Sequence, residues 1–217
     1  MEASDRQGLT RARRARQLHG IYAIVNEGPD AVAIARAALT AGVAILQYRA
    51  KNGIDALHLE QLRELTIDAG ALLIVNDDWR AALAFDCDGV HLGPDDDGFA
   101  AVAPVRAALG DRLIGLSCGT LPEAQAANAQ DLDYIGVGAV YATASKADAG
   151  EPIGIEGLRR IAAAGRYPVA AIGGIGLSEI EAVRASGVAM AAVISAIAAA
   201  PDPGAAARAL VERWNGA

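Results

Sequence analysis

Gln47, Arg49 and Lys51 stand where their side chains could bind a pyrophosphate group. They alternate along the end of a short apolar run, so they would point to one face of an extended segment. An arginine can form forked hydrogen bonds to a phosphate, and a lysine adds a compact positive charge. Because two buried cations without an anion are costly, we expect an anion clamp here rather than an ordinary exposed strand end.

The chain's two lysines point to the same chemistry. Of the 19 basic residues 17 are arginine, and the lysines are Lys51 and Lys146. Lys146 lies with Thr143 and Ser145 in a Gly- and Ala-rich stretch from residue 141 to about residue 157. A long loop in a compact domain is usually functional. We therefore expect these three side chains to supply donors to a leaving pyrophosphate.

Acidic residues follow two consecutive apolar runs. The first run ends in Asn76, Asp77 and Asp78, and the second is followed by three aspartates at 95–97. We expect Asp78 to cap the next helix. Mg²⁺ is usually held by one or two carboxylates together with substrate phosphate oxygens. Two acidic clusters beside a basic clamp therefore predict a metal–pyrophosphate site.

Glycines near the end of the chain predict a second phosphate site. Gly173 and Gly174 follow the seventh apolar run, and Ile194 and Ser195 end the eighth. Glycine lets the backbone approach an anion closely. In an eight-unit barrel the loops after strands 7 and 8 commonly bind phosphate. Plain turn glycines are the alternative.

The elements that would position these residues are eight apolar runs, each nearly continuous in Val, Ile, Leu and Ala. They span residues 20–26, 44–49, 71–76, 88–93, 113–118, 134–138, 168–173 and 190–195. Continuous runs are typical of parallel strands covered on both faces. Helical patterns lie between them, for example at 30–42, 55–70 and 177–187.

Eight strand–helix units without a linker favour an α/β fold of one domain, a closed (β/α)₈ (TIM) barrel. A doubly wound open sheet is the rival arrangement. We expect residues 1–18 to form an N-terminal helical extension and residues 19–217 to form the barrel.

Composition limits the partners. A net charge of −7 and a pI of about 4.9 argue against a nucleic-acid surface. The basic run of Arg11, Arg13, Arg14 and Arg16 is expected to be a solvated helix face. No apolar stretch has transmembrane length and no secretory signal is evident, so a cytoplasmic enzyme without membrane partners is expected.

Eight motifs carry a resemblance to a known family: QYRAK, VNDD, GVHLGPDDD, GLSCGT, GVGAVYATASK, PIGIEGL, AIGGI and AVISAI. In this order, over about residues 20–213, they closely resemble the thiamine phosphate synthases. The resemblance implies a Mg²⁺-dependent transferase that joins hydroxymethylpyrimidine pyrophosphate to hydroxyethylthiazole phosphate. In the reaction it implies, pyrophosphate leaves first and the thiazole nitrogen then attacks the methylene carbon.

The resemblance also implies roles for residues that match the family's motifs. It implies contacts to the pyrimidine pyrophosphate from Gln47, Arg49, Lys51 and Asn76. It implies that one Mg²⁺ ion is held by Asp77 and Asp96. It places Ser117 and Lys146 at the pyrophosphate and the reacting centre. It implies a thiazole phosphate site built from Thr143, Ser145, Gly174, Ile194 and Ser195. Electrostatic catalysis would then fall to Lys146, Arg49, Lys51 and Ser117, with no covalent nucleophile. Cys118 is expected to be inert, and His91 structural.

The departures from the family pattern are Ala139 and Ala142 in place of Pro, Ser145 in place of Thr, and Gly119 where many relatives carry His. A thiazole tautomerase-like isomerase is one alternative, although Gly119 offers it no acid/base group. Another phosphate-binding barrel isomerase or aldolase would lack the two acidic clusters. A non-catalytic paralogue that binds a thiamine precursor is the last alternative. The sequence leaves assembly into a homo-oligomer open.

Overall fold

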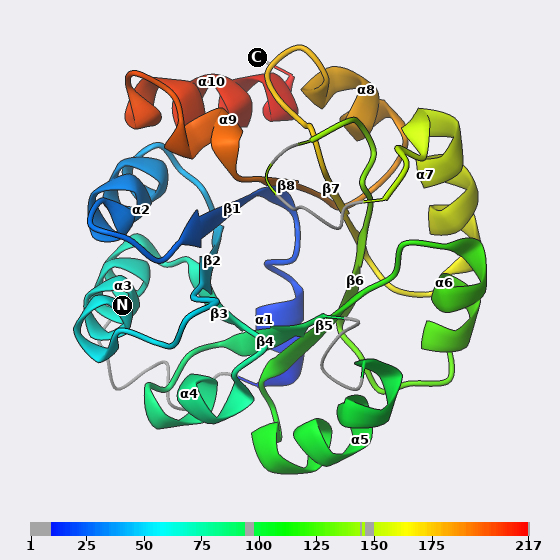
Figure 1. Ribbon diagram of the computed structural model, residues 1–217, viewed down its shortest axis with the longest axis horizontal. Helices are drawn as coiled ribbons and strands as arrows, with labels where there is room; N and C mark the ends of the chain where they lie inside the picture. The colour runs from blue at the N-terminus through cyan, green and yellow to red at the C-terminus, as the bar shows by residue number, and fades with distance from the viewer. Residues whose placement is uncertain (1–9, 94–97, 144, 146–149, 217) are drawn as a thin grey trace.

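A computed structural model of the chain describes residues 10–93, 98–143, 145 and 150–216. Its centre is a closed barrel of eight parallel strands, seen end-on in Figure 1. The strands are β1 (Gly20–Asn26), β2 (Ile45–Arg49), β3 (Leu72–Asn76), β4 (Gly89–Leu92), β5 (Leu113–Ser117), β6 (Tyr134–Val137), β7 (Val169–Ile172) and β8 (Met190–Val193).

Closure is set by the pairing of the first strand with the last. Gly20 of β1 aligns with Met190 of β8, and Tyr22 aligns with Ala192. The prediction of a (β/α)₈ barrel is therefore confirmed, and the open-sheet alternative is wrong. The predicted apolar runs match the strands to within one or two residues at each end.

Helices surround the barrel on the outside (Figure 1). In chain order they are α1 (Arg11–Ala15), α2 (Ala31–Thr40), α3 (Ala56–Ala69), α4 (Trp79–Ala84), α5 (Gly98–Leu109), α6 (Leu121–Ala127), α7 (Gly154–Ala164), α8 (Ile180–Ala185), α9 (Ser195–Ala198) and α10 (Pro203–Asn215). Helix α1 is the exception, because it lies across one end of the barrel. Among the described residues, no helix is both long enough and apolar enough to span a membrane.

Local sequence accounts for several helix ends. Asp55 accepts a hydrogen bond from the backbone N–H of His58 at 3.0 Å and caps the start of α3. The same helix ends at Gly70, whose φ of 71° lies in the left-handed region that glycine adopts without steric cost. Asp78 accepts from the N–H of Ala81 at 2.9 Å, so its predicted role as the cap of α4 is confirmed.

Two apolar layers hold the barrel together. The inner layer fills the barrel with side chains such as Tyr22, Ile74, Tyr134 and Met190. The outer layer lies between the strands and the helices and contains most of the other buried residues. Because strand side chains alternate, neighbouring apolar residues of a strand belong to different layers, which is why the runs look continuously apolar in the sequence.

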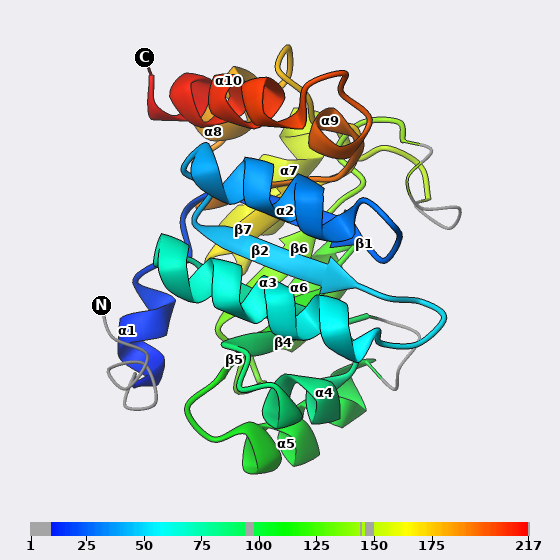
Figure 2. The same cartoon turned by 90° about the vertical axis from the view of Figure 1, so that its left-hand side faces the viewer.

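Helix α1 is fixed to the end of the barrel where the strands begin (Figure 2). Arg14 is 4% exposed, and its Nε lies 3.1 Å from a carboxylate oxygen of the fully buried Asp88. The Nε of Arg11 lies 2.6 Å from a carboxylate oxygen of Asp133. The prediction of a solvated basic face is therefore wrong for Arg11 and Arg14, because carboxylates on other elements pair with both guanidinium groups.

Candidate active site

A cavity of about 550 Å³ opens at the end of the barrel where the strands finish. In this fold the loops after the strands build the active site at that end. Of the predicted site residues, Lys146 and Asp96 lie outside the described part of the chain. The others all line this cavity: Gln47, Arg49, Lys51, Asn76, Asp77, Ser117, Thr143, Ser145, Gly174, Ile194 and Ser195.

The predicted basic clamp comes from β2 and the loop after it. Gln47 and Arg49 line the cavity, and Tyr48 between them belongs to the outer core layer, as strand alternation requires. A guanidinium nitrogen of Arg49 donates to the side-chain oxygen of Asn26 on the neighbouring strand at 3.3 Å. Lys51 is exposed at the start of the loop and lines the rim of the same cavity. Two cations therefore face one side of the cavity.

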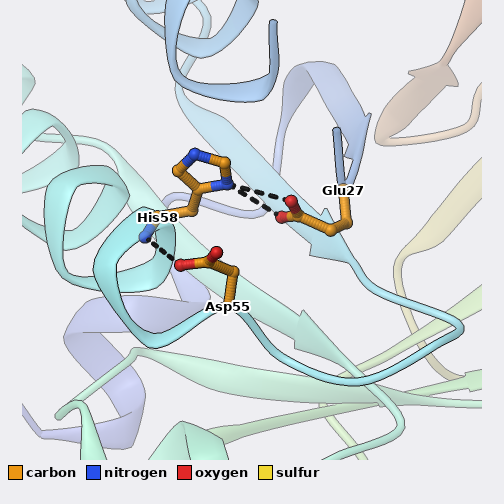
Figure 3. Close-up of side chains that lie close together, drawn as sticks. All are labelled: Glu27, Asp55 and His58. Carbon is orange, nitrogen blue, oxygen red and sulfur yellow. Dashed lines mark hydrogen bonds and ion pairs between the residues drawn. The ribbon is translucent and has the colours of Figure 1, made fainter. Parts of the chain in front are cut away.

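The loop that carries Lys51 is held at its base by four side chains that we call the Glu27 clasp: Glu27, Tyr48, Asp55 and His58 (Figure 3 shows three of them). The phenol of Tyr48 donates to Glu27 and accepts from the backbone N–H of Asp55 at 3.2 Å. The Nδ1 atom of His58 lies 2.9 Å from a carboxylate oxygen of Glu27. The clasp therefore joins the end of β1, strand β2 and the start of α3.

The Glu27 clasp contains three potential metal ligands, since suitable atoms of Glu27, Asp55 and His58 lie within 4.8 Å of one another. These groups already bind one another or the start of α3, and none of the three lines the cavity. The arrangement of Glu27, Asp55 and His58 is explained by their role in joining the end of β1, strand β2 and the start of α3.

Asp77 has an unusual backbone conformation for an aspartate, with φ of 62°. Its backbone N–H donates to the carbonyl oxygen of His91 at 2.9 Å. One carboxylate oxygen accepts from the N–H of Gly93 at 2.9 Å, and the other accepts from the side-chain amide of Asn76. Non-glycine residues in the left-handed region cluster at functional sites. These contacts orient the carboxylate at the cavity wall.

The loop after β6 packs on the glycines after β7. The N–H of Val140 donates to the carbonyl of Ile172 at 2.9 Å, and the N–H of Tyr141 donates to that of Gly173 at 3.0 Å. Gly174 has φ of 63°, and a Cβ atom there would lie 2.5 Å from the carbonyl oxygen of Ala142. The glycines are therefore required because two loops approach each other closely. A plain turn would not impose this requirement.

The same loop reaches the short helix α9. The hydroxyl of Ser145 donates to the hydroxyl of Ser195 at 3.4 Å, and the N–H of Ser145 donates to the hydroxyl of Thr143 at 3.1 Å. Ile194 occupies the position before the first residue of α9. Hydroxyl groups and backbone from the ends of β6, β7 and β8 therefore gather at one side of the cavity.

Sequence reasoning missed several cavity residues, and two of them carry titratable side chains with defined hydrogen bonds. His91 lines the cavity, and its Nε2 atom lies 3.0 Å from the hydroxyl oxygen of Ser117. Glu123 lines it as well and accepts from the backbone N–H of Gly119 at 2.7 Å and of Thr120 at 2.9 Å. Thr120 and Glu123 have the spacing of a capping box, and this pattern could have indicated the position of Glu123 at the start of α6.

Beneath the cavity the barrel contains buried phenols. The hydroxyl groups of Tyr22 and Tyr134 lie 2.9 Å apart, and the side-chain nitrogen of Gln47 donates to Tyr22 at 2.7 Å. Burial raises the pKa of both phenols above the usual value, so both stay protonated at neutral pH. They are available as neutral donors and acceptors.

Cys118 lines the cavity but is poorly suited to be a nucleophile. Its side chain is buried, and burial raises the pKa of the thiol to about 12. Because the thiolate is the reactive form, this thiol is held in its unreactive state near neutral pH.

Comparison with known proteins gives one consistent result. A family model described as thiamine monophosphate synthase matches residues 21–197. A thiamine-phosphate synthase from Moorella thermoacetica is 45% identical over 191 residues, which cover 85% of this chain and 89% of that protein. A bifunctional thiamine biosynthesis protein from Symbiobacterium thermophilum is 46% identical over 88% of this chain, which spans only 40% of that longer protein.

A solved structure agrees in fold as well as in sequence. Thiamine phosphate pyrophosphorylase from Pyrococcus furiosus superposes with a TM-score of 0.82 and is 35% identical. The match covers 93% of this chain and 98% of the other.

Proposed function

The chain belongs to the thiamine monophosphate synthase family, and from that premise we propose a specific reaction for its cavity. It is a transferase that condenses 4-amino-2-methyl-5-hydroxymethylpyrimidine pyrophosphate with 4-methyl-5-(2-phosphoethyl)thiazole. The products are thiamine phosphate and pyrophosphate. The observation that carries this proposal is the juxtaposition of Arg49 and Lys51 with the carboxylate of Asp77 in one cavity.

The charges of the cavity fit a pyrophosphate better than a single phosphate. Arg49 and Lys51 would bind its oxygens by forked and point-charge contacts, respectively. The carboxylate of Asp77 would repel the same oxygens unless a cation lay between them. The donor set therefore calls for a divalent metal ion as well as the two basic side chains.

Asp77 fits the role of a Mg²⁺ ligand. Its two carboxylate oxygens accept the hydrogen bonds described above, which hold the group at the cavity wall. Oxygen ligands of this kind are those that Mg²⁺ prefers, together with substrate phosphate oxygens and water. We propose Asp77 and Asp96 as its protein ligands, and the contribution of Asp96 stays a prediction. When bound, the ion would offset the negative charge of the pyrophosphate.

The proposed chemistry is a Mg²⁺-assisted dissociative displacement. The bond between the methylene carbon and the pyrophosphate oxygen breaks, and its electron pair leaves with the pyrophosphate. Arg49, Lys51, Lys146 and Ser117 stabilise the charge that develops on this leaving group. The thiazole nitrogen then supplies the electron pair of the new carbon–nitrogen bond. Gln47 and Asn76 hold the pyrimidine pyrophosphate in place for this attack.

The part of the cavity wall that follows β6, β7 and β8 suits the thiazole phosphate. Gly174 lines the cavity, and Ile194 joins the end of β8 to Ser195, the first residue of α9. We propose that Gly174, Ile194 and Ser195 bind the phosphate. Thr143 and Ser145 add hydroxyl donors, and the hydrogen bond between Ser145 and Ser195 supports their joint placement.

The expected partners are these two small molecules, with no nucleic acid and no membrane. Location in the cytoplasm and assembly into a homo-oligomer remain predictions.

The test is product formation from the two substrates with Mg²⁺ and again with EDTA. We expect thiamine phosphate only when the metal is present. Asp77→Ala and Lys146→Ala should each lower kcat by at least about 100-fold, the order of magnitude for loss of a preorganised charge at a reacting centre. Asp68→Ala, an exposed carboxylate on α3, is the matched control and should retain activity. Absence of product from the folded wild-type protein would refute the proposed reaction.

A further inference from the structure

A chain of hydrogen bonds crosses the barrel interior from one side of the cavity to the other. The side-chain nitrogen of Gln47 donates to the hydroxyl of Tyr22 at 2.7 Å, and this hydroxyl lies 2.9 Å from that of Tyr134. The hydroxyl of Tyr134 lies 3.1 Å from Nδ1 of His91, and Nε2 of His91 lies 3.0 Å from the hydroxyl of Ser117. Both ends of the chain, Gln47 and Ser117, line the cavity.

Two strand glycines make room for the imidazole in this chain. A Cβ atom at Gly115 would lie 2.6 Å from Nδ1 of His91, and one at Gly136 would lie 3.0 Å from its Cε1. In the strand register His91 aligns with Gly115, which aligns in turn with Tyr134. The ring is also tilted at 33° to that of Tyr134, with centroids 5.5 Å apart. Packing therefore holds the ring with Nδ1 toward the barrel interior and Nε2 toward Ser117.

The first link limits the direction of the protons. Because an amide nitrogen can only donate, the hydroxyl of Tyr22 accepts from Gln47. Tyr134 is the other described hydrogen-bond partner of this hydroxyl, and we assign the Tyr22 proton to that bond. With that assignment Tyr134 donates to Nδ1 of His91, which is then unprotonated. The proton of a neutral imidazole therefore resides on Nε2 and is donated to the oxygen of Ser117.

The tautomer decides what Ser117 can offer to a substrate. If Nε2 carries the proton, the Ser117 oxygen accepts from it and the hydroxyl proton is free to donate into the cavity. If Nδ1 carried the proton, Ser117 would donate to Nε2 and would turn a lone pair toward the cavity. Only the first arrangement stabilises an anionic oxygen.

We propose that His91 is a positioning residue whose Nε2–H orients the Ser117 hydroxyl as a hydrogen-bond donor toward the departing pyrophosphate. This inference rests on the proposed function for the identity of the anion. It assigns to His91 a role that acts through Ser117, without contact to the substrate.

The first test reads the tautomer without any activity measurement. Long-range ¹H–¹⁵N correlation spectra of the full-length, ¹⁵N-labelled protein report the protonation of each histidine nitrogen. The chain has three histidines, His19, His58 and His91, so His91→Gln assigns the signals by their loss. We expect a protonated Nε2 and an unprotonated Nδ1. Tyr134→Phe, which removes the donor to Nδ1, should shift this balance toward the other tautomer. A protonated Nδ1 in the wild-type protein would overturn the proposal.

The second test separates positioning from simple packing. His91→Leu removes the donor and should lower kcat by on the order of 10- to 100-fold, as expected for one hydrogen bond to a charged group, with a smaller change in KM. His91→Gln carries an N–H donor at the place of Nε2 and should recover most of this loss. In a Ser117→Ala background, His91→Leu should have little further effect because its partner is already absent. His19→Gln, at an exposed histidine, is the matched control.

The outcomes distinguish this inference from the proposed function. Full activity in folded His91→Leu, or additive losses in the double variant, would refute the positioning role while the synthase activity stands. A wild-type protein that makes no thiamine phosphate would refute the function instead, and would also remove the anion that the inference requires.

Discussion

Replacement of Asp88 by asparagine should strongly destabilise the barrel without affecting its catalytic cavity. The Asp88 carboxylate is fully buried beneath the strands, at the end closed by α1. It accepts from Arg14 at 3.1 Å, from Arg63 at 3.0 Å and from the backbone N–H of Leu73 at 3.1 Å. Asparagine keeps the shape but removes the negative charge between two buried guanidinium groups.

The size of the effect follows from these contacts. A hydrogen bond to a charged group contributes about 1.5–3 kcal/mol, and two such bonds to arginine lose their charge assistance. Removal of one partner from a buried ion pair costs about 3–5 kcal/mol, because the remaining charge loses a close counter-charge. We therefore expect Asp88→Asn to lower the free energy of unfolding by about 3–5 kcal/mol.

Urea unfolding followed by circular dichroism measures this change. Glu181→Gln is the matched control, since it neutralises the carboxylate of an exposed pair in which Arg213 lies 2.9 Å from Glu181. We expect no resolvable change in that variant because exposed pairs contribute little. If Asp88→Asn and Glu181→Gln were equally stable, the argument from burial would be refuted. Under conditions where the variant is folded, its KM values should equal those of the wild type, because the network lies at the opposite end of the barrel.

Further predictions concern the loops and the thiols. Gly174→Ala would place a Cβ 2.5 Å from the Ala142 carbonyl oxygen and so displace the loop. The KM for thiazole phosphate should then rise at least about 10-fold, the sensitivity expected of misplaced binding groups. An unchanged KM would contradict this prediction. Glu27→Gln removes the charged acceptor of the Glu27 clasp. The KM for the pyrimidine pyrophosphate should rise by about 3- to 10-fold, which corresponds to the free energy of one hydrogen bond. The KM for thiazole phosphate should stay unchanged. Equal effects on both substrates would instead indicate general loosening of the fold. Thr120→Ala removes the cap of α6 and should cost about 1 kcal/mol in thermal unfolding. Burial raises the pKa of Cys87 and Cys118 to about 12 from 9.0, so their contribution to stability should be complete below pH 9 and lost as pH rises toward 12. Alkylation at pH 8 should label them only after unfolding, and rapid labelling of the native protein would refute the inference of burial.

The sequence was a good guide to the strands, and eleven predicted site residues lie at the cavity wall. Strand side chains alternate, so residues two apart on one run must share a face, and Gln47 and Arg49 do line the cavity together. Parallel strands in a closed barrel end at the same rim, which brings Asp77, Ser117 and Gly174 to one place although they are far apart in the chain. These placements follow from periodicity and topology.

Sequence reasoning failed where a side chain depends on partners from other elements. Arg14 looks like one more solvated arginine, and only the packing of α1 beneath the barrel brings it to Asp88. His91 could not be placed in one chemical environment, because its neighbours in space, Ser117 and Tyr134, come from β5 and β6. The Glu27 clasp likewise joins three elements that no local pattern connects.

The sequence by itself therefore determined the barrel, its strand ends and several of the residues that face its mouth, because these depend on side-chain periods and capping rules that act over a few residues. Only the tertiary structure decided which polar atoms meet. The register between strands fixes the distance between Nε2 of His91 and Ser117, and the space left by Gly115 and Gly136 fixes the orientation of the ring. Hydrogen bonds act over about 3 Å, so these partners are set by packing between strands rather than by spacing along the chain.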